Sequence, residues 1–280
     1  MPDTLSLLAF AVQFGYYAVA LLLVGILLGR GFGVTRKQSI PASALLALVV
    51  LSLYAVRLML ANAKLGGSFI AAFDLATLPW IWRAYELQAF AVMIGCGLAA
   101  AGALLQWWLA MLAAALMLSA SFGLAGHTQG LEAPGIFPWL AGLHVLVAGF
   151  WFAAPVSLWP RTKLDQAELV RRLETFSHIA QFAVPALFGA GLILALRLAD
   201  GWGGLIGSAY GRLLLAKLFV ASAALALGAF NKTWVTGRMA QNEHQGRAAL
   251  KLTLSIEFVA FLSTLALIAL ATTALGPEDL

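Results

Sequence analysis

Charged side chains are scarce in this chain: they make up 10% of its 280 residues, whereas hydrophobic residues make up 62%. A soluble domain carries about 25% charged residues, so most of this chain is expected to lie out of contact with water. Its hydrophobic runs are long and continuous rather than short and alternating, which favours membrane-spanning helices over the strands of a barrel. The sequence therefore predicts a helical integral membrane protein with little room for a soluble domain.

Cysteine is nearly absent as well, since Cys96 is the only one in the chain. A single thiol excludes an intrachain disulfide framework and any metal motif built on cysteine pairs. The phosphate-binding pattern GxxxxGK[ST] does not occur, so we expect no ATP-driven step in this chain, and we expect no enzymatic activity. The net charge of +5 does not indicate nucleic-acid binding, because Lys and Arg in a membrane protein mark the cytoplasmic loops.

The first hydrophobic run has no basic residue ahead of it, so we expect it to remain as a spanning helix rather than to act as a cleaved signal peptide. Each span needs roughly 20 apolar residues. Eight runs meet that need: 5–29, 40–61, 80–104, 107–126, 138–160, 175–199, 211–231 and 250–275. We predict an all-α polytopic membrane protein, a bundle of eight transmembrane helices that forms one domain over residues 1–280.

Basic residues are distributed unevenly among the loops between these runs. Alternate loops hold 11 of the 17 Lys and Arg residues: Arg30, Arg36, Lys37, Arg161, Lys163, Arg171, Arg172, Lys232, Arg238, Arg247 and Lys251. Positive charge accumulates on the cytoplasmic side of a membrane. The distribution therefore predicts that the N-terminus and the C-terminus both lie on the outer side of the membrane.

Two of the four histidines flank the short Gly/Pro-rich loop between the fourth and fifth runs. His127 follows the fourth run, and His144 lies six residues past Pro138. Helices joined by so short a loop are antiparallel neighbours, so both imidazoles can approach one mouth of the hairpin. An imidazole in an apolar segment is costly unless it finds a partner. Two interpretations remain open here: one shared metal or proton site, or two separate hydrogen bonds to nearby carbonyl groups.

The third run contains two soft sulfur side chains, Met93 and Cys96. Sulfur ligands select Cu(I) among the common metals, but both residue types also fill cores. Glu86 lies seven residues before Met93 and therefore shares its helical face. We expect Glu86 to form an ion pair with Arg83 or Arg57, with a role in an ion path as the alternative.

Ionisable residues also lie in the last three runs. A buried charge costs at least about 2.5–3.5 kcal/mol, so Lys217 and Glu257 must face protein or a cavity. Their predicted depths differ by roughly 10 Å, which argues against a direct pair. Glu257 is either a proton or cation relay or the partner of Asn231. His178, near the predicted inner surface, is either part of an exit or an interfacial contact, and Pro185 predicts a kink beside a cavity or path.

Five short motifs occur between residues 126 and 277. They are FSHIAQFAVPALFGAGLILA at 176–195, YGRLLLAKLFVASAALALGAFNK at 210–232, SIEFVAFLSTLALIALATTALGP at 255–277, Gly126-His127-Thr128, and His144 within LHVLVAGFW. Over residues 120–277 the chain resembles the CopD family of copper-resistance proteins. One departure from that family follows Trp151, where Phe-Ala-Ala-Pro replaces small residues with two glycines.

The resemblance implies copper transport across the inner membrane of a bacterial cell toward the cytoplasm, with a copper ion, Cu(I) or Cu(II), as the metal. In such a membrane the outer side is the periplasm, so both termini are then predicted to be periplasmic. It implies that His127 and His144 bind copper, and that a CopC-type periplasmic copper-binding protein is a partner besides membrane lipid. Two other functions remain open. Intramembrane histidines also ligate haem, as in a haem b electron-transfer protein, and a copper-delivery assembly factor for an oxidase would show the same residues.

Overall fold

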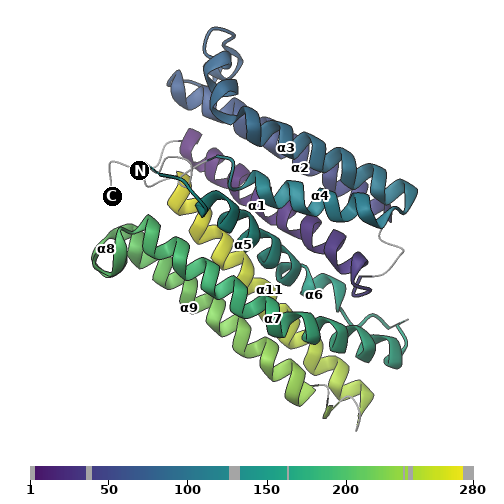
Figure 1. The fold of residues 1–280 in the computed structure, drawn as a ribbon. Coiled ribbons are helices and arrows are strands. Elements are labelled where there is room, and N and C mark those ends of the chain that lie inside the picture. Colours follow the sequence, from purple (N-terminus) through teal and green to yellow (C-terminus); the bar gives the residue numbers. More distant parts are fainter. Residues whose placement is uncertain are drawn as a thin grey trace.

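The computed structural model describes residues 4–35, 40–125, 133–162, 164–235, 237–238 and 242–273. Every regular element in these residues is a helix (Figure 1). The elements are α1 (Thr4–Gly31), α2 (Ile40–Leu65), η2 (Ile70–Phe73), α3 (Leu78–Leu105), α4 (Trp108–Ser121), α5 (Phe137–Phe152), α6 (Ala154–Ser157), α7 (Gln166–Leu198), α8 (Gly201–Gly207), α9 (Ala209–Phe230), η3 (Asn231–Val235) and α11 (Glu243–Thr273). The predicted all-α class is confirmed.

Among the described residues, seven helices are long and apolar enough to cross a membrane: Thr4–Gly31, Ala42–Leu65, Leu78–Leu105, Phe137–Ser157, Gln166–Leu198, Gly211–Trp234 and Glu243–Thr273. The eighth predicted span corresponds to α4, whose 14 residues extend about 21 Å. It ends early because the bonds from Phe122 N to Ser119 O (3.2 Å) and from Gly123 N to Ala120 O (2.9 Å) tighten its last turn. The multi-pass architecture is confirmed, whereas the count of eight spans and the periplasmic termini remain predictions.

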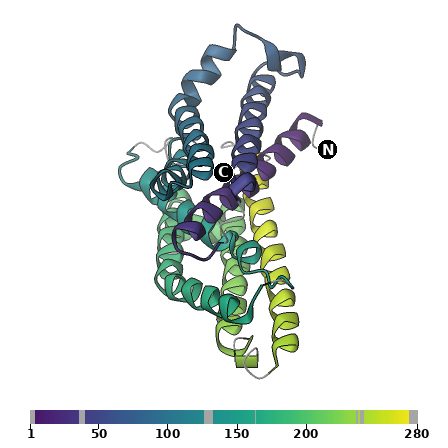
Figure 2. The ribbon, with the colours of Figure 1, turned by 90° about the vertical axis from the view of Figure 1, so that its right-hand side faces the viewer.

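The first helix, α1, is the central helix of the bundle and packs against α2, α4, α5 and α11 (Figures 1 and 2). Its side chains Leu23 and Val24 are fully buried. Where α1 meets α5, Gly25 lies against the backbone of Gly149, and a β-carbon on Gly25 would overlap the Gly149 carbonyl group. Small residues thus let the two backbones approach closely, as is usual between membrane helices.

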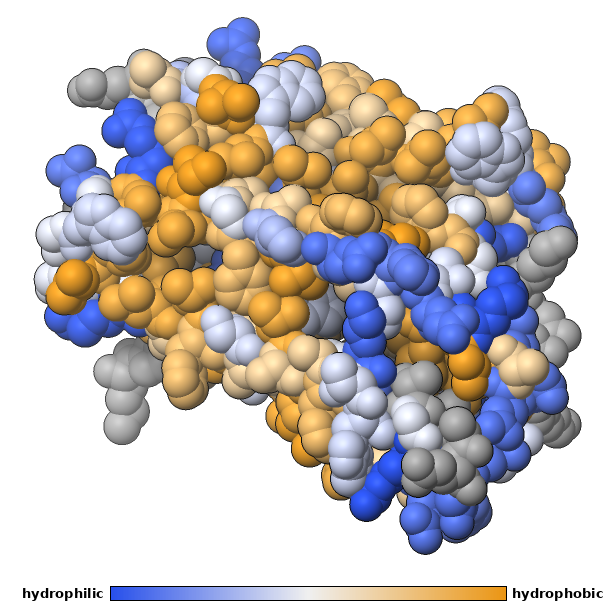
Figure 3. All heavy atoms as spheres, turned by 60° about the horizontal axis from the view of Figure 1, so that its bottom comes forward, coloured by the Kyte–Doolittle hydropathy of each residue, from blue (hydrophilic) through white to orange (hydrophobic). Residues whose placement is uncertain are grey.

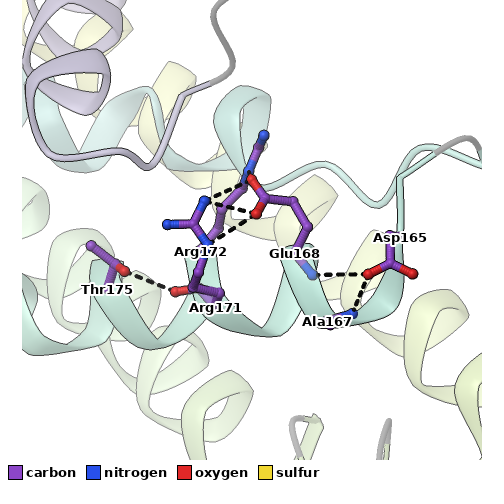
Figure 4. A network of polar contacts seen from close by, with 6 residues as sticks. All are labelled: Asp165, Ala167, Glu168, Arg171, Arg172 and Thr175. Carbon is purple, nitrogen blue, oxygen red and sulfur yellow. Dashed lines mark hydrogen bonds and ion pairs between the residues drawn. The ribbon is translucent and has the colours of Figure 1, made fainter.

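The N-terminus of α7 is charged and lies well before the predicted run 175–199. The Asp165 side chain caps this end by accepting bonds from the backbone amides two and three residues later, at 3.0 and 3.4 Å (Figure 4). Glu168 then forms ion pairs of 2.7 Å with Arg171 and with Arg172. These charged turns lie outside the hydrophobic run, so hydropathy alone predicts a start that is too late.

The outer surface of the bundle is largely hydrophobic, and hydrophilic residues gather toward the helix ends (Figure 3). Large apolar side chains such as Phe182 and Phe219 are 75% and 77% exposed. Such exposure fits a surface that contacts lipid rather than water. At one end of the bundle, Lys64 Nζ donates to Thr273 O at 3.4 Å, so α2 and α11 finish at the same end.

Candidate functional site

Two cavities lie one after the other between α5, α7, α9 and α11. The first, which we name the His144 cavity, has a volume of about 300 Å³ and borders α7 residues 187–195. The second, the Glu257 cavity, has a volume of about 280 Å³ and borders α7 residues 173–185. Trp151 of α5 borders both cavities. The Trp151 indole therefore lies between two cavities that each contain polar side chains.

His144 is held by one hydrogen bond between helices: its Nδ1 lies 3.1 Å from the carbonyl oxygen of Leu187 on α7. A carbonyl oxygen can only accept, so Nδ1 carries the proton and Nε2 keeps the lone pair. Histidines that bind metals commonly donate their other ring N–H in this way. The predicted stripe of His144, Ala148 and Trp151 on one face of the helix is confirmed, since all three border the His144 cavity.

The space for this imidazole depends on a glycine of α7. A β-carbon added to Gly191 would lie 3.0 Å from His144 Cε1 and 3.4 Å from Nδ1. Two residues earlier, a β-carbon on Gly189 would meet no atom within 4 Å. Gly191 therefore lets α7 approach the ring closely enough for the Leu187 carbonyl group to bind it.

Lys217 of α9 borders the same cavity as His144. In the described part of the chain, its ammonium has no carboxylate within 4 Å, because the ion pairs there are those of Glu168 and Glu243. Lys217 and Glu257 border different cavities. The prediction that they form no direct pair is thus confirmed.

Glu257 faces the interior of the bundle, as predicted, and only 2% of its surface is exposed. Its Oε1 accepts a hydrogen bond of 3.1 Å from Asn231 Nδ2. Asn231 is the first residue of η3, a π-helical turn that directly follows α9. The predicted contact between the end of this helix and Glu257 is therefore confirmed, and it lies in the wall of the Glu257 cavity.

Pro185 lies inside α7 and borders the Glu257 cavity. Proline has no N–H, so the carbonyl oxygen four residues earlier, on Gln181, loses its usual helical donor. Gln181 borders the same cavity. Pro185 and Gln181 thus border the same cavity as the Glu257 carboxyl group.

Several predicted site residues do not border either cavity. Met93 is 40% exposed on the outside of α3, whereas Cys96 is 4% exposed and packs in the hydrophobic core. His178 is exposed near the start of α7. His127 lies outside the described residues, so its predicted meeting with His144 stays a prediction.

The predicted ion pairs of Glu86 are not formed in the described part of the chain. Glu86 is exposed, and no ion pair within 4 Å joins it to Arg83 or Arg57. Arg57 Nη1 instead donates to Gln88 Oε1 at 3.0 Å. Its guanidinium also lies 5.4–5.8 Å from three tyrosine ring centroids. The sequence prediction was wrong because it considered only charged partners for Arg57. The residue that Arg57 binds, Gln88, is a neutral amide on another face of α3.

Clusters that would hold a metal in a closed cage do not occur among the described residues, where no group of three or more His, Cys, Asp and Glu side chains converges. The two cavities instead offer single ligands: an imidazole in one, and a carboxyl group with an amide neighbour in the other. Each cavity thus contains an incomplete ligand set for an ion.

The fold and its two internal cavities define a multi-pass helical membrane protein. Residues 170–271, from α7 into α11, match the family described as copper resistance protein D (CopD). This match confirms the CopD resemblance over that segment and relates this part of the chain to copper-resistance membrane proteins. No curated protein and no solved structure matches the chain. The matched segment includes Lys217, Asn231 and Glu257 but not His144.

Proposed function

We propose that the protein carries copper across the membrane toward the cytoplasm, through the His144 cavity and then the Glu257 cavity. The observation that carries the proposal is the bond between His144 Nδ1 and Leu187 O, because it leaves the Nε2 lone pair available to a metal ion. The family match supports copper as that ion. Copper is the transported substrate here and not a resident cofactor.

The Glu257 cavity contains the groups that a copper ion needs after it leaves the His144 imidazole. The Glu257 carboxylate supplies negative charge in a site of low dielectric, and Asn231 orients that carboxylate. Gln181, whose carbonyl oxygen lacks its helical donor because of Pro185, borders the same cavity. Conduction requires sites that bind strongly enough to admit an ion and weakly enough to release it. Two incomplete ligand sets in series meet that condition better than one closed cage.

The direction of transport follows from the predicted orientation. With a periplasmic N-terminus, the His144 cavity lies nearer the periplasm and the Glu257 cavity nearer the cytoplasm. His127 then provides an entry ligand at the mouth of the hairpin, where a CopC-type carrier delivers copper. The membrane potential favours inward movement of a cation by about 2.3 kcal/mol per charge per 100 mV, so no nucleotide is required.

Uptake of labelled copper by proteoliposomes that contain the purified full chain tests this function. We expect copper to enter these vesicles faster than it enters protein-free vesicles, and faster still when the interior is made negative. Copper that binds to the protein without entering the vesicles would contradict transport and would favour a delivery role. An intense haem band in the absorption spectrum would favour electron transfer, although among the described histidines only His144 borders one of these two cavities.

A further inference from the structure

The His144 cavity is bordered by a lysine, Lys217. Lys217 stands eight residues after the start of α9 at Ala209, which places it about 12 Å from that end of the helix. No carboxylate of the described residues lies within 4 Å of its ammonium group. A cation at this depth is costly without an ionic or hydrogen-bonding partner, and a bare copper ion of like charge would add repulsion rather than supply that partner.

The rest of the cavity wall is almost entirely hydrocarbon. Apart from Lys217 and the His144 ring, the polar side chains that border it are Tyr17, Thr264 and the indole of Trp151. The other bordering residues are aliphatic, aromatic or glycine, and the volume of about 300 Å³ lies at the lower end of the range for ligand sites. A cavity of this composition accepts a hydrophobic body with one anionic group.

The His144 cavity lies between α7 and α9. Both helices contribute residues to it, including Leu192 from α7 and Leu218 from α9. In the described part of the chain, the backbones of these two helices come close at few points. This side of the cavity is therefore not closed by tight backbone packing, and a ligand dissolved in the bilayer would enter there.

We propose that the His144 cavity binds a long-chain fatty acid, with its carboxylate on the Lys217 ammonium and its hydrocarbon chain along the apolar wall. Carboxylate and ammonium form a charge-assisted hydrogen bond, which supplies the missing counter-charge. A small inorganic anion would leave the apolar wall unfilled, and a neutral lipid would leave Lys217 unpaired. This inference goes beyond copper transport: the fatty acid occupies the cavity that contains His144 and so excludes copper from it.

Equilibrium binding of labelled palmitate to the full chain in a neutral detergent tests the site, with hexadecanol as the uncharged probe of the same chain length. We expect the wild-type protein to prefer palmitate. Lys217→Met should weaken palmitate binding by about tenfold or more, because a hydrogen bond to a charged group is lost, and should leave hexadecanol binding unchanged. Lys217→Arg should keep the preference. Lys251→Met is the matched control, since Lys251 borders neither cavity.

Equal binding of palmitate and hexadecanol, or wild-type palmitate binding by Lys217→Met, would overturn the proposal. Displacement of palmitate by millimolar chloride would also overturn it, in favour of a small-anion site. If Lys217→Met does not fold, Ala221→Phe tests the same point by filling the cavity, and it should abolish palmitate binding with the lysine intact. Palmitate binding in a protein that takes up no copper would refute transport alone, and uptake without palmitate binding would refute this inference alone.

Discussion

Asn231 and Glu257 join the end of α9 to α11 through a hydrogen bond of 3.1 Å in the wall of the Glu257 cavity. The bond connects two side chains that lie 26 positions apart in the sequence. The Asn231 amide donates, so the carboxyl group keeps a second oxygen for another partner. This hydrogen bond distinguishes two roles for Glu257. Fastening α9 to α11 requires only a hydrogen-bond acceptor, whereas passage of a cation requires a negative charge.

Glu257→Gln keeps the shape and the acceptor oxygen and removes the charge. We expect this variant to insert and to unfold within about 1–2 kcal/mol of the wild type, because the Asn231 amide then donates to a neutral oxygen in place of a charged one. Copper uptake by proteoliposomes should fall to the level of protein-free vesicles. Glu174→Gln is the control, since Glu174 is exposed on α7 and should transport normally. Full uptake by Glu257→Gln would assign Glu257 a purely structural role.

Gly191→Ala should weaken copper binding while Gly189→Ala should not. The new methyl group at Gly191 would lie 3.0 Å from His144 Cε1, so the ring must move and its bond to Leu187 must lengthen. We expect the copper dissociation constant to rise by about tenfold, the effect of losing an outer-shell contact. The methyl group at Gly189 meets no atom within 4 Å, and alanine favours the helix by about 0.5–1 kcal/mol. Equal copper affinities for the two variants would disprove the role of Gly191.

Gly25→Ala should destabilise the protein through the contact between α1 and α5. Its β-carbon would overlap the Gly149 carbonyl group, and separating two packed helices costs about 1–3 kcal/mol. Gly97→Ala on α3 is the control, because its β-carbon meets nothing within 4 Å. Thermal unfolding in detergent measures both variants. A Gly25→Ala protein as stable as Gly97→Ala would show that the helices are not in such close contact.

Met93→Leu and Cys96→Ser should take up copper at the wild-type rate. Neither sulfur borders the His144 cavity or the Glu257 cavity, and Met93 is 40% exposed on the outer side of α3. Leucine nearly conserves the volume of methionine, so folding should be intact. Slower copper uptake by either variant, with unchanged stability, would show that the sulfur atom contributes to copper transport. The copper route would then have to pass closer to α3.

The sequence predicted those features that depend on long runs or on one helix face. The positions of the spanning helices followed from hydropathy, and the shared face of His144, Ala148 and Trp151 followed from helical periodicity. The inward direction of Glu257 followed from the cost of exposing a charge to lipid. Each of these predictions needs only local chemistry.

Features that depend on contacts between helices were not predictable in the same way. The choice of Gln88 rather than Glu86 as the partner of Arg57 is set by how α2 and α3 are rotated against each other. The acceptor for His144 is a backbone carbonyl group 43 residues away, and any residue type could have supplied it. The early start of α7 depends on capping by Asp165, a signal that lies outside the hydrophobic run.

The most direct test of the transport route is the initial rate of labelled-copper uptake by proteoliposomes containing His144→Ala, compared with His244→Ala. His144 lines the first cavity, whereas His244 is exposed at the start of α11. With equal amounts of folded protein and an interior-negative potential, we predict that His144→Ala takes up copper no faster than protein-free vesicles and that His244→Ala matches the wild type. Wild-type uptake by His144→Ala would contradict the proposed path through the His144 cavity.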